Sequence, residues 1–99
     1  MAFDPAYLKA SAQRALTGII GPQILGIGVT VAGTRLVVSA YAAGSLGEEE
    51  REDLDSATAE IIADFPEAAG IELRVVERAK APLTTDGIWA FLKPGTSVT

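Results

Sequence analysis

The sequence contains no cysteine and no histidine among its 99 residues, and aromatic residues make up only 6% of it. Without cysteine the chain has no disulfide framework and no thiolate nucleophile, and without histidine it has no imidazole for acid–base catalysis. Together the two absences exclude every zinc site built from Cys and His ligands. Because the usual reactive centres are excluded, we predict a binding protein rather than an enzyme, with no cofactor and no metal site.

The residues that are present suit a small folded protein. Hydrophobic residues make up 48% of the chain and charged residues 21%, a balance that supports a hydrophobic core. A length of 99 residues lies in the range of one domain. We therefore predict a single α+β domain over residues 1–99, with a disordered tail at 96–99.

Two segments show the periodicity of helices, and four show the alternation of strands. Asp4 before Pro5 is a typical helix start, and apolar residues from Leu8 to Ile19 then recur at three- and four-residue spacing, up to the helix end predicted at Gly21. Ser45, followed by Glu48, has the spacing of a capping box before a second amphipathic segment, which ends at Pro66. Alternation with a period of two predicts strands over 25–31, 36–41, 71–75 and 88–92.

The resulting order, α-β-β-α-β-β, predicts a two-layer sandwich. The four strands would form a mainly antiparallel sheet, and both helices would cover one of its faces. The other face would carry polar and aromatic side chains, which suit either solvent or a protein partner. Tyr41 belongs to this second face, and its amphipathic ring makes it a candidate for partner contact.

The run from Ala15 to Thr34 carries no charge and is long enough to cross a bilayer. Glycines and Pro22 interrupt it and its second half alternates, so it predicts a helix end, a turn and a strand rather than a membrane span. The opening residues Met1 to Pro5 have no basic stretch followed by an apolar one. We therefore expect no membrane partner, no secretory signal and a cytoplasmic location.

A glycine-rich run at 21–28 is reminiscent of a phosphate-binding loop. Such a loop needs Lys and Ser or Thr after its last glycine and leads into a helix, whereas Val29 and Thr30 follow here in a strand. We interpret the glycines instead as allowing close packing of a helix against the hairpin. The cations are dispersed along the chain, so we expect no nucleic-acid partner.

Acidic residues are concentrated in one segment. The formal net charge is −5, and residues 48–55 alone hold six acids against one base, which accounts for the whole imbalance. These acids either form a surface that attracts a cationic protein, or serve the helix dipole and solubility. Together with Tyr41, we take five of them as candidate partner-binding residues: Glu48, Glu49, Glu50, Glu52 and Asp53.

Four stretches resemble small acidic bacterial immunity proteins of toxin systems such as contact-dependent growth inhibition. They are IIGP at 19–22, YAAGSLGEEERE at 41–52, ATAEIIADFPEA at 57–68 and GIWAFLKPG at 87–95. The resemblance implies a non-catalytic protein that neutralises a cognate toxin by stoichiometric binding, and the acidic segment would suit a basic toxin such as a nuclease. The alternative is a structural or adaptor domain whose second sheet face forms a homodimer, with the acids serving solubility alone.

Overall fold

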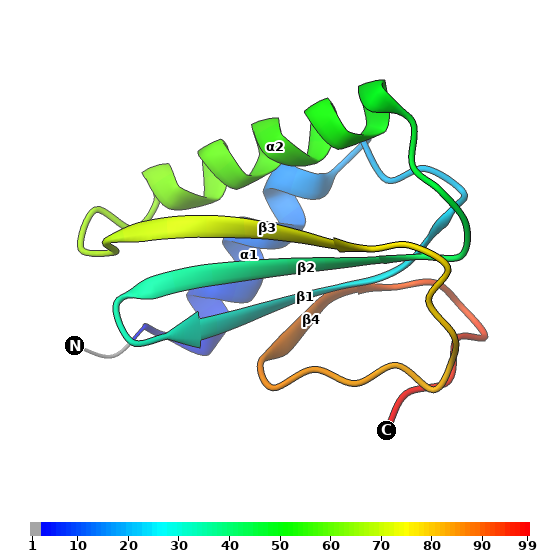
Figure 1. Ribbon diagram of the computed structural model, residues 1–99. Helices are drawn as coiled ribbons and strands as arrows, with labels where there is room; N and C mark the ends of the chain where they lie inside the picture. Colours follow the sequence, from blue (N-terminus) through cyan, green and yellow to red (C-terminus); the bar gives the residue numbers. More distant parts are fainter. Residues whose placement is uncertain (1–2) are drawn as a thin grey trace.

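The structure is a computed structural model that describes residues 3–99; Met1 and Ala2, which begin the segment inspected for an export signal, lie outside the described residues. Figure 1 shows both helices on one side of a single sheet, so the two-layer α+β prediction is confirmed. The elements follow in the predicted order: α1 (Pro5–Leu16), β1 (Ile24–Ala32), β2 (Arg35–Ala42), α2 (Glu48–Ala63), β3 (Gly70–Val76) and β4 (Ile88–Leu92).

The four strands form a mixed sheet with the order β3-β2-β1-β4. β1 pairs antiparallel with both β2 and β4, so antiparallel pairing predominates as expected. β3 runs parallel to β2, a direction that the hydrophobic pattern does not reveal. Parallel neighbours need a long connection between them, and α2 provides that crossover.

α1 begins as the sequence predicts but ends earlier. The side chain of Asp4 accepts a hydrogen bond from the N–H of Ala6 at 3.0 Å, which caps the first turn. The helix ends at Leu16, and Gly18 follows with a φ of +82°, a conformation that a residue without Cβ adopts readily. Ile19, which the periodicity placed in the helix, therefore lies beyond it and packs, partly buried, against the core.

The N-cap of α2 lies two residues after its predicted position at Ser45. The N-cap is Gly47, whose N–H donates to Oε1 of Glu50 at 3.1 Å, so the predicted capping by Ser45 is wrong. The cap moves along the chain because Leu46 is buried in the core before the helix starts. Gly47 has no side chain to return the hydrogen bond, and only one half of the capping-box arrangement exists.

The core lies between the sheet and the two helices. Alternate residues of each strand point toward the helices, which follows from the period of two in a strand. A polar contact joins the helices beside this core: buried Ser11 donates from Oγ to Oδ2 of Asp64 at 2.7 Å, and Arg14 pairs with the same carboxylate. The most deeply buried large side chains are Leu16, Ile27, Val29, Leu36, Val38, Ile61 and Phe65.

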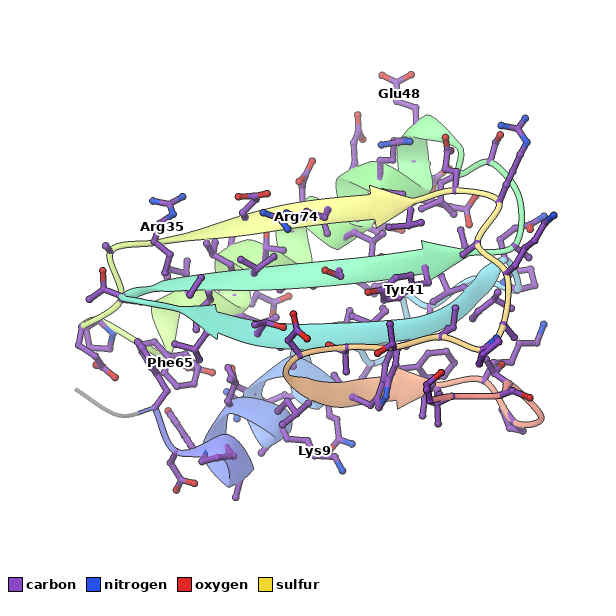
Figure 2. The ribbon with its side chains drawn as sticks, turned by 60° about the horizontal axis from the view of Figure 1, so that its bottom comes forward. Lys9, Arg35, Tyr41, Glu48, Phe65 and Arg74 are labelled. Carbon is purple, nitrogen blue, oxygen red and sulfur yellow. The ribbon has the colours of Figure 1, made fainter. Side chains whose placement is uncertain are left out.

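Residues 77–87, which we call the strap, cross the helix-free face of the sheet between β3 and β4. Figure 2 looks onto this face and shows the strap running along β1 and β4. A Cβ added at Gly28 would lie 2.8 Å from Oγ1 of Thr85, and one added at Gly87 would lie 1.9 Å from the carbonyl oxygen of Val29. The β1 glycines thus admit the strap rather than a helix, which corrects the interpretation from the sequence.

The C-terminal tail pairs with the strap. The N–H of Leu83 donates to the carbonyl of Ser97 at 2.9 Å, and the N–H of Thr99 donates to the carbonyl of Leu83 at 2.8 Å. Leu83 is itself buried, so the tail lies along an anchored segment. These backbone bonds join residues 97–99, which belong to the tail expected at 96–99, to the strap.

Candidate functional site

The candidate residues chosen from the sequence lie on two sides of the sheet. The acids at 48–53 occupy the first turns of α2, in the helix layer. Tyr41 lies on the helix-free face, where its hydroxyl donates to the carbonyl of Thr84 in the strap. Figure 2 shows Glu48 and Tyr41 well apart, on different elements. A partner that contacts both groups would have to reach around an edge of the sheet.

The acids of α2 differ in exposure. Glu50 and Asp53 are half-buried, and Glu50 caps the helix through the N–H of Gly47. Asp55, which was not among the sequence-based candidates, is exposed, and its spacing from Glu48 and Glu52 places it on the same side of the helix. That spacing was the signal in the sequence that could have identified it. We define the acidic surface by the four exposed acids of the segment 48–55, which are Glu48, Glu49, Glu52 and Asp55.

The helix dipole explains only part of this acidic surface. Glu48 and Glu49 lie in the first turn of α2, where a negative charge is favourable next to the free N–H groups. The dipole effect falls off beyond that turn, so it does not account for Glu52 or Asp55. These two acids concentrate like charges on one side of the helix, where the repulsion between them opposes folding slightly.

The only cation of the acidic segment is engaged outside α2. Nη2 of Arg51 lies 3.1 Å from Oε2 of Glu77, the residue that follows β3. The same carboxylate oxygen accepts the N–H of Leu46 at 2.7 Å. The hydrogen bond from Leu46 lowers the pKa of Glu77 below its usual value, and Arg51 and Arg78 lower it further against the opposing effect of desolvation. Reasoning from sequence missed Glu77, because its partners are about 30 residues away and no local pattern marks them.

No ion pair within residues 3–99 includes a member of the acidic surface. The three pairs in this part of the chain are Arg14–Asp64, Arg51–Glu77 and Arg74–Glu72. The charges of the acidic surface are therefore not neutralised by side chains of the described residues. A surface of this kind attracts cationic groups and repels phosphates.

The helix-free face holds a shallow groove of about 390 Å³ between the strap and β3. Tyr41 is at its border, with its ring centroid 5.8 Å from that of Trp89 and its hydroxyl bonded to the strap. Arg74 is paired with Glu72 at 2.6 Å, and the hydrogen bond from Arg74 lowers the pKa of Glu72. Hydroxyl groups and charges dominate the rest of the lining: Thr30, Ser39, Arg74, Thr84, Thr85 and Asp86.

Within the described part of the chain, the groove does not bring together a nucleophile and a base. Ser39 and the threonines around it have no histidine to activate them, because the sequence contains none. Among residues 3–99, no group of three or more potential metal-ligating side chains converges. Over the same residues, neither helix combines the length and the apolar character needed to cross a bilayer.

The comparisons with known proteins address the family directly. A family model described as MafI2 immunity protein matches residues 5–94. A search of curated proteins finds no match. The matched range includes all six helices and strands, the acidic surface and the strap. The match confirms the resemblance to immunity proteins of toxin systems. The chain belongs to the MafI2 immunity protein family.

Proposed function

We propose that the protein neutralises a cognate basic toxin by binding it through the acidic surface of α2. Membership of an immunity family points to a non-catalytic role and to a toxin as the protein partner. The single observation that carries the choice of surface is that its four acids are exposed and that none of them joins an ion pair within residues 3–99. The protein would act stoichiometrically, in the cytoplasm.

The charge of this surface would act mainly on the rate and the specificity of association. Clustered charges steer an oppositely charged partner during diffusion and disfavour wrong partners. A nuclease is a suitable class of toxin, because an enzyme that binds phosphates must present cations near its active site. A complex in which α2 covers those cations would block access of the nucleic acid.

The test uses the protein together with its toxin domain, which is first identified by co-purification. In the variant Glu49→Lys/Glu52→Lys, two exposed acids are reversed, and neither of them caps the helix. We expect the association rate, measured by stopped flow at low salt, to fall on the order of tenfold or more. The difference from the wild type should shrink as salt is added, because exposed charges are screened.

A matched control separates local from overall charge. Glu67→Lys/Asp86→Lys makes the same change in net charge at two exposed acids outside α2. If toxin association is unchanged in Glu49→Lys/Glu52→Lys, the acidic surface is not the binding site. An equal fall in both double variants would mean that net charge alone, and not this surface, governs association.

The alternative is a homodimer formed through the helix-free face. The observation that favours it is the half-buried pair of Tyr41 and Trp89, because aromatic residues are enriched in the centres of interfaces. Such a dimer would persist at high salt, whereas association through the acidic surface weakens. Sedimentation of the isolated protein across a salt series separates the two: a salt-resistant dimer without toxin binding would favour the alternative.

A further inference from the structure

The partner with which Arg51 forms an ion pair determines how negative the acidic surface is. Arg51 is three residues from Glu48 and four from Asp55, the spacings at which side chains pair along a helix. A pair with either acid would neutralise part of the acidic surface. Instead, the guanidinium of Arg51 lies 3.1 Å from the carboxylate of Glu77, across the end of β3.

Glu77 is held in place independently of Arg51. Its Oε2 accepts the N–H of Leu46, a buried residue that directly precedes the N-cap of α2. The next two residues continue this attachment through the backbone: the N–H of Arg78 donates to Gly44, and that of Ala79 donates to Ala42 at 2.8 Å. The start of the strap is thus joined by hydrogen bonds to the connection between β2 and α2. These bonds place the carboxylate of Glu77 beside the first turns of α2, where it contacts Arg51.

We propose that Glu77 is a positioning residue for toxin recognition: it pairs with Arg51 away from the acidic surface, so that the acids of α2 meet the partner without a counter-charge from their own helix. The consequence for toxin binding rests on the proposed function. The effect of Glu77 on Arg51 and on the charge of the acidic surface does not rest on the proposed function, and this effect is measurable without toxin.

Three variants separate this role from a merely structural one. In Glu77→Gln the amide oxygen still accepts the N–H of Leu46, but the charge that holds Arg51 is gone, and Arg51 is free to pair with Glu48 or Asp55. In Arg51→Gln/Glu77→Gln the cation is removed as well, so the acidic surface is restored. Arg51→Gln alone makes the surface more negative. A structural role of the carboxylate predicts the same loss in Glu77→Gln and in the double variant, because both lack it.

The second Glu–Arg pair within residues 3–99 provides a control for the charge change. Glu72 lies 2.6 Å from Arg74 on the helix-free face, on the opposite side of the sheet from α2. Glu72→Gln therefore removes the same charge from the same type of pair. Any effect that depends only on net charge appears equally in Glu72→Gln and Glu77→Gln.

The first measurement is the electrostatic potential near the backbone amides of 48–55, from NMR relaxation caused by a cationic and an anionic nitroxide in solution. We expect relaxation by the cationic nitroxide to fall about twofold in Glu77→Gln, the factor that one unit charge gives at roughly 8 Å in water, and the ratio of cationic to anionic relaxation to fall roughly fivefold, because the anion responds in the opposite direction. The ratio should return to the wild-type value in the double variant, rise in Arg51→Gln and stay unchanged in Glu72→Gln. Failure to recover in the double variant, or an equal fall in Glu72→Gln, overturns the inference.

The second measurement is the association rate with the toxin domain, on the same variants. We expect a fall of about twofold in Glu77→Gln and recovery in the double variant.

If Glu49→Lys/Glu52→Lys slows association and Glu77→Gln does not, the role of Glu77 is overturned while the proposed function stands. If neither variant slows association but the potentials change as expected, the proposed function fails and the hold of Glu77 on Arg51 stands. If Glu77→Gln does not fold, Arg51→Gln decides: a lower ratio or slower association than in the wild type overturns the inference.

Discussion

The two faces of the sheet are formed by the same four strands but are covered in different ways. Toward the helices, β1 and β2 present branched aliphatic residues such as Val29 and Val38, which are almost fully buried. Toward the other side, the same strands present Gly28 and Ser39, and the strap lies against part of that surface. Large apolar side chains fill the space between the sheet and the helices. On the helix-free face, the glycines of β1 have no side chain and let the strap approach the backbone.

Because of this difference, the stability of the fold and its exposed charge depend on different parts of the protein. The helix-covered face holds the core, where each large buried side chain contributes about 1.5–3 kcal/mol. The helix-free face relies on backbone proximity, on the buried side chain of Leu83 in the strap and on hydrogen bonds such as that from Tyr41 to Thr84. The acidic surface belongs to neither face: it lies on the outer side of α2, where its charges do not disturb the packing beneath.

The largest effect is expected from Ile61→Ala, because Ile61 is fully buried in α2 against the sheet. Removal of its side chain leaves a cavity, and the free energy of unfolding should fall by about 2–5 kcal/mol. Denaturant unfolding followed by circular dichroism measures this loss. Ile62→Ala, at the half-buried neighbouring position, is the control. Equal losses at the two positions would contradict the assignment of the core-facing side of α2.

The next effect is expected from Gly87→Ala on the other face. The added Cβ would lie 1.9 Å from the carbonyl oxygen of Val29, which is backbone, so the strap has to move. We expect a loss of about 1–3 kcal/mol in the free energy of unfolding and faster hydrogen exchange at the N–H of Leu83. Gly47→Ala is the control, since its Cβ would be 3.6 Å from the nearest atom. An unaltered strap in Gly87→Ala would mean that this close approach is not required.

A smaller effect is expected from Tyr41→Phe, which removes one hydrogen bond and keeps the ring next to Trp89. An exposed hydrogen bond of this type contributes about 0.5–1 kcal/mol, so stability should fall by no more than that. Tyr7→Phe is the counterpart on the helix-covered side, where the ring packs 5.1 Å from that of Phe65. The same loss in both variants would show that the bond to the strap has no special role.

The smallest effect concerns pH. The pKa of Glu77 is lower in the folded protein than its usual value of about 4.5 because of the N–H of Leu46 and of Arg51. Its contribution to stability is therefore complete above the usual pKa and is lost as the pH falls through the lowered value. In Glu77→Gln, the decline in stability between pH 7 and pH 3, measured by thermal unfolding, should be shallower than in the wild type. A decline as steep as that of the wild type would mean that Leu46 and Arg51 do not lower the pKa of Glu77.

The pattern of local residues was enough to predict most of the fold. Asp4 marked the start of α1, and Pro66 followed the end of α2, because caps and breakers act on the adjacent turn. Alternation also assigned the correct face to Val38 and Tyr41 in β2. The position of the α2 cap was wrong because burial of Leu46, a tertiary effect, outweighed the local capping pattern.

The candidate site was predictable only in part. The acidic segment is visible in the sequence, since six acids lie within 48–55. The sequence did not show that Glu50 is engaged in the cap or that Asp55 is exposed with its neighbours. It also placed Tyr41 with the acids in one candidate set, although the two lie on different sides of the sheet. Whether two residues share one surface depends on how the helices and strands pack together. The spacing of residues along one segment does not determine this packing.

Residues close together in the chain were enough to set the order of the elements, the apolar side of each strand and the concentration of negative charge in α2. The parallel direction of β3 beside β2, the position of the strap over β1 and the pairing of Glu77 with Arg51 follow only from the tertiary structure. Each of these joins segments far apart in the chain, and such contacts are set by packing and backbone hydrogen bonding of the whole fold.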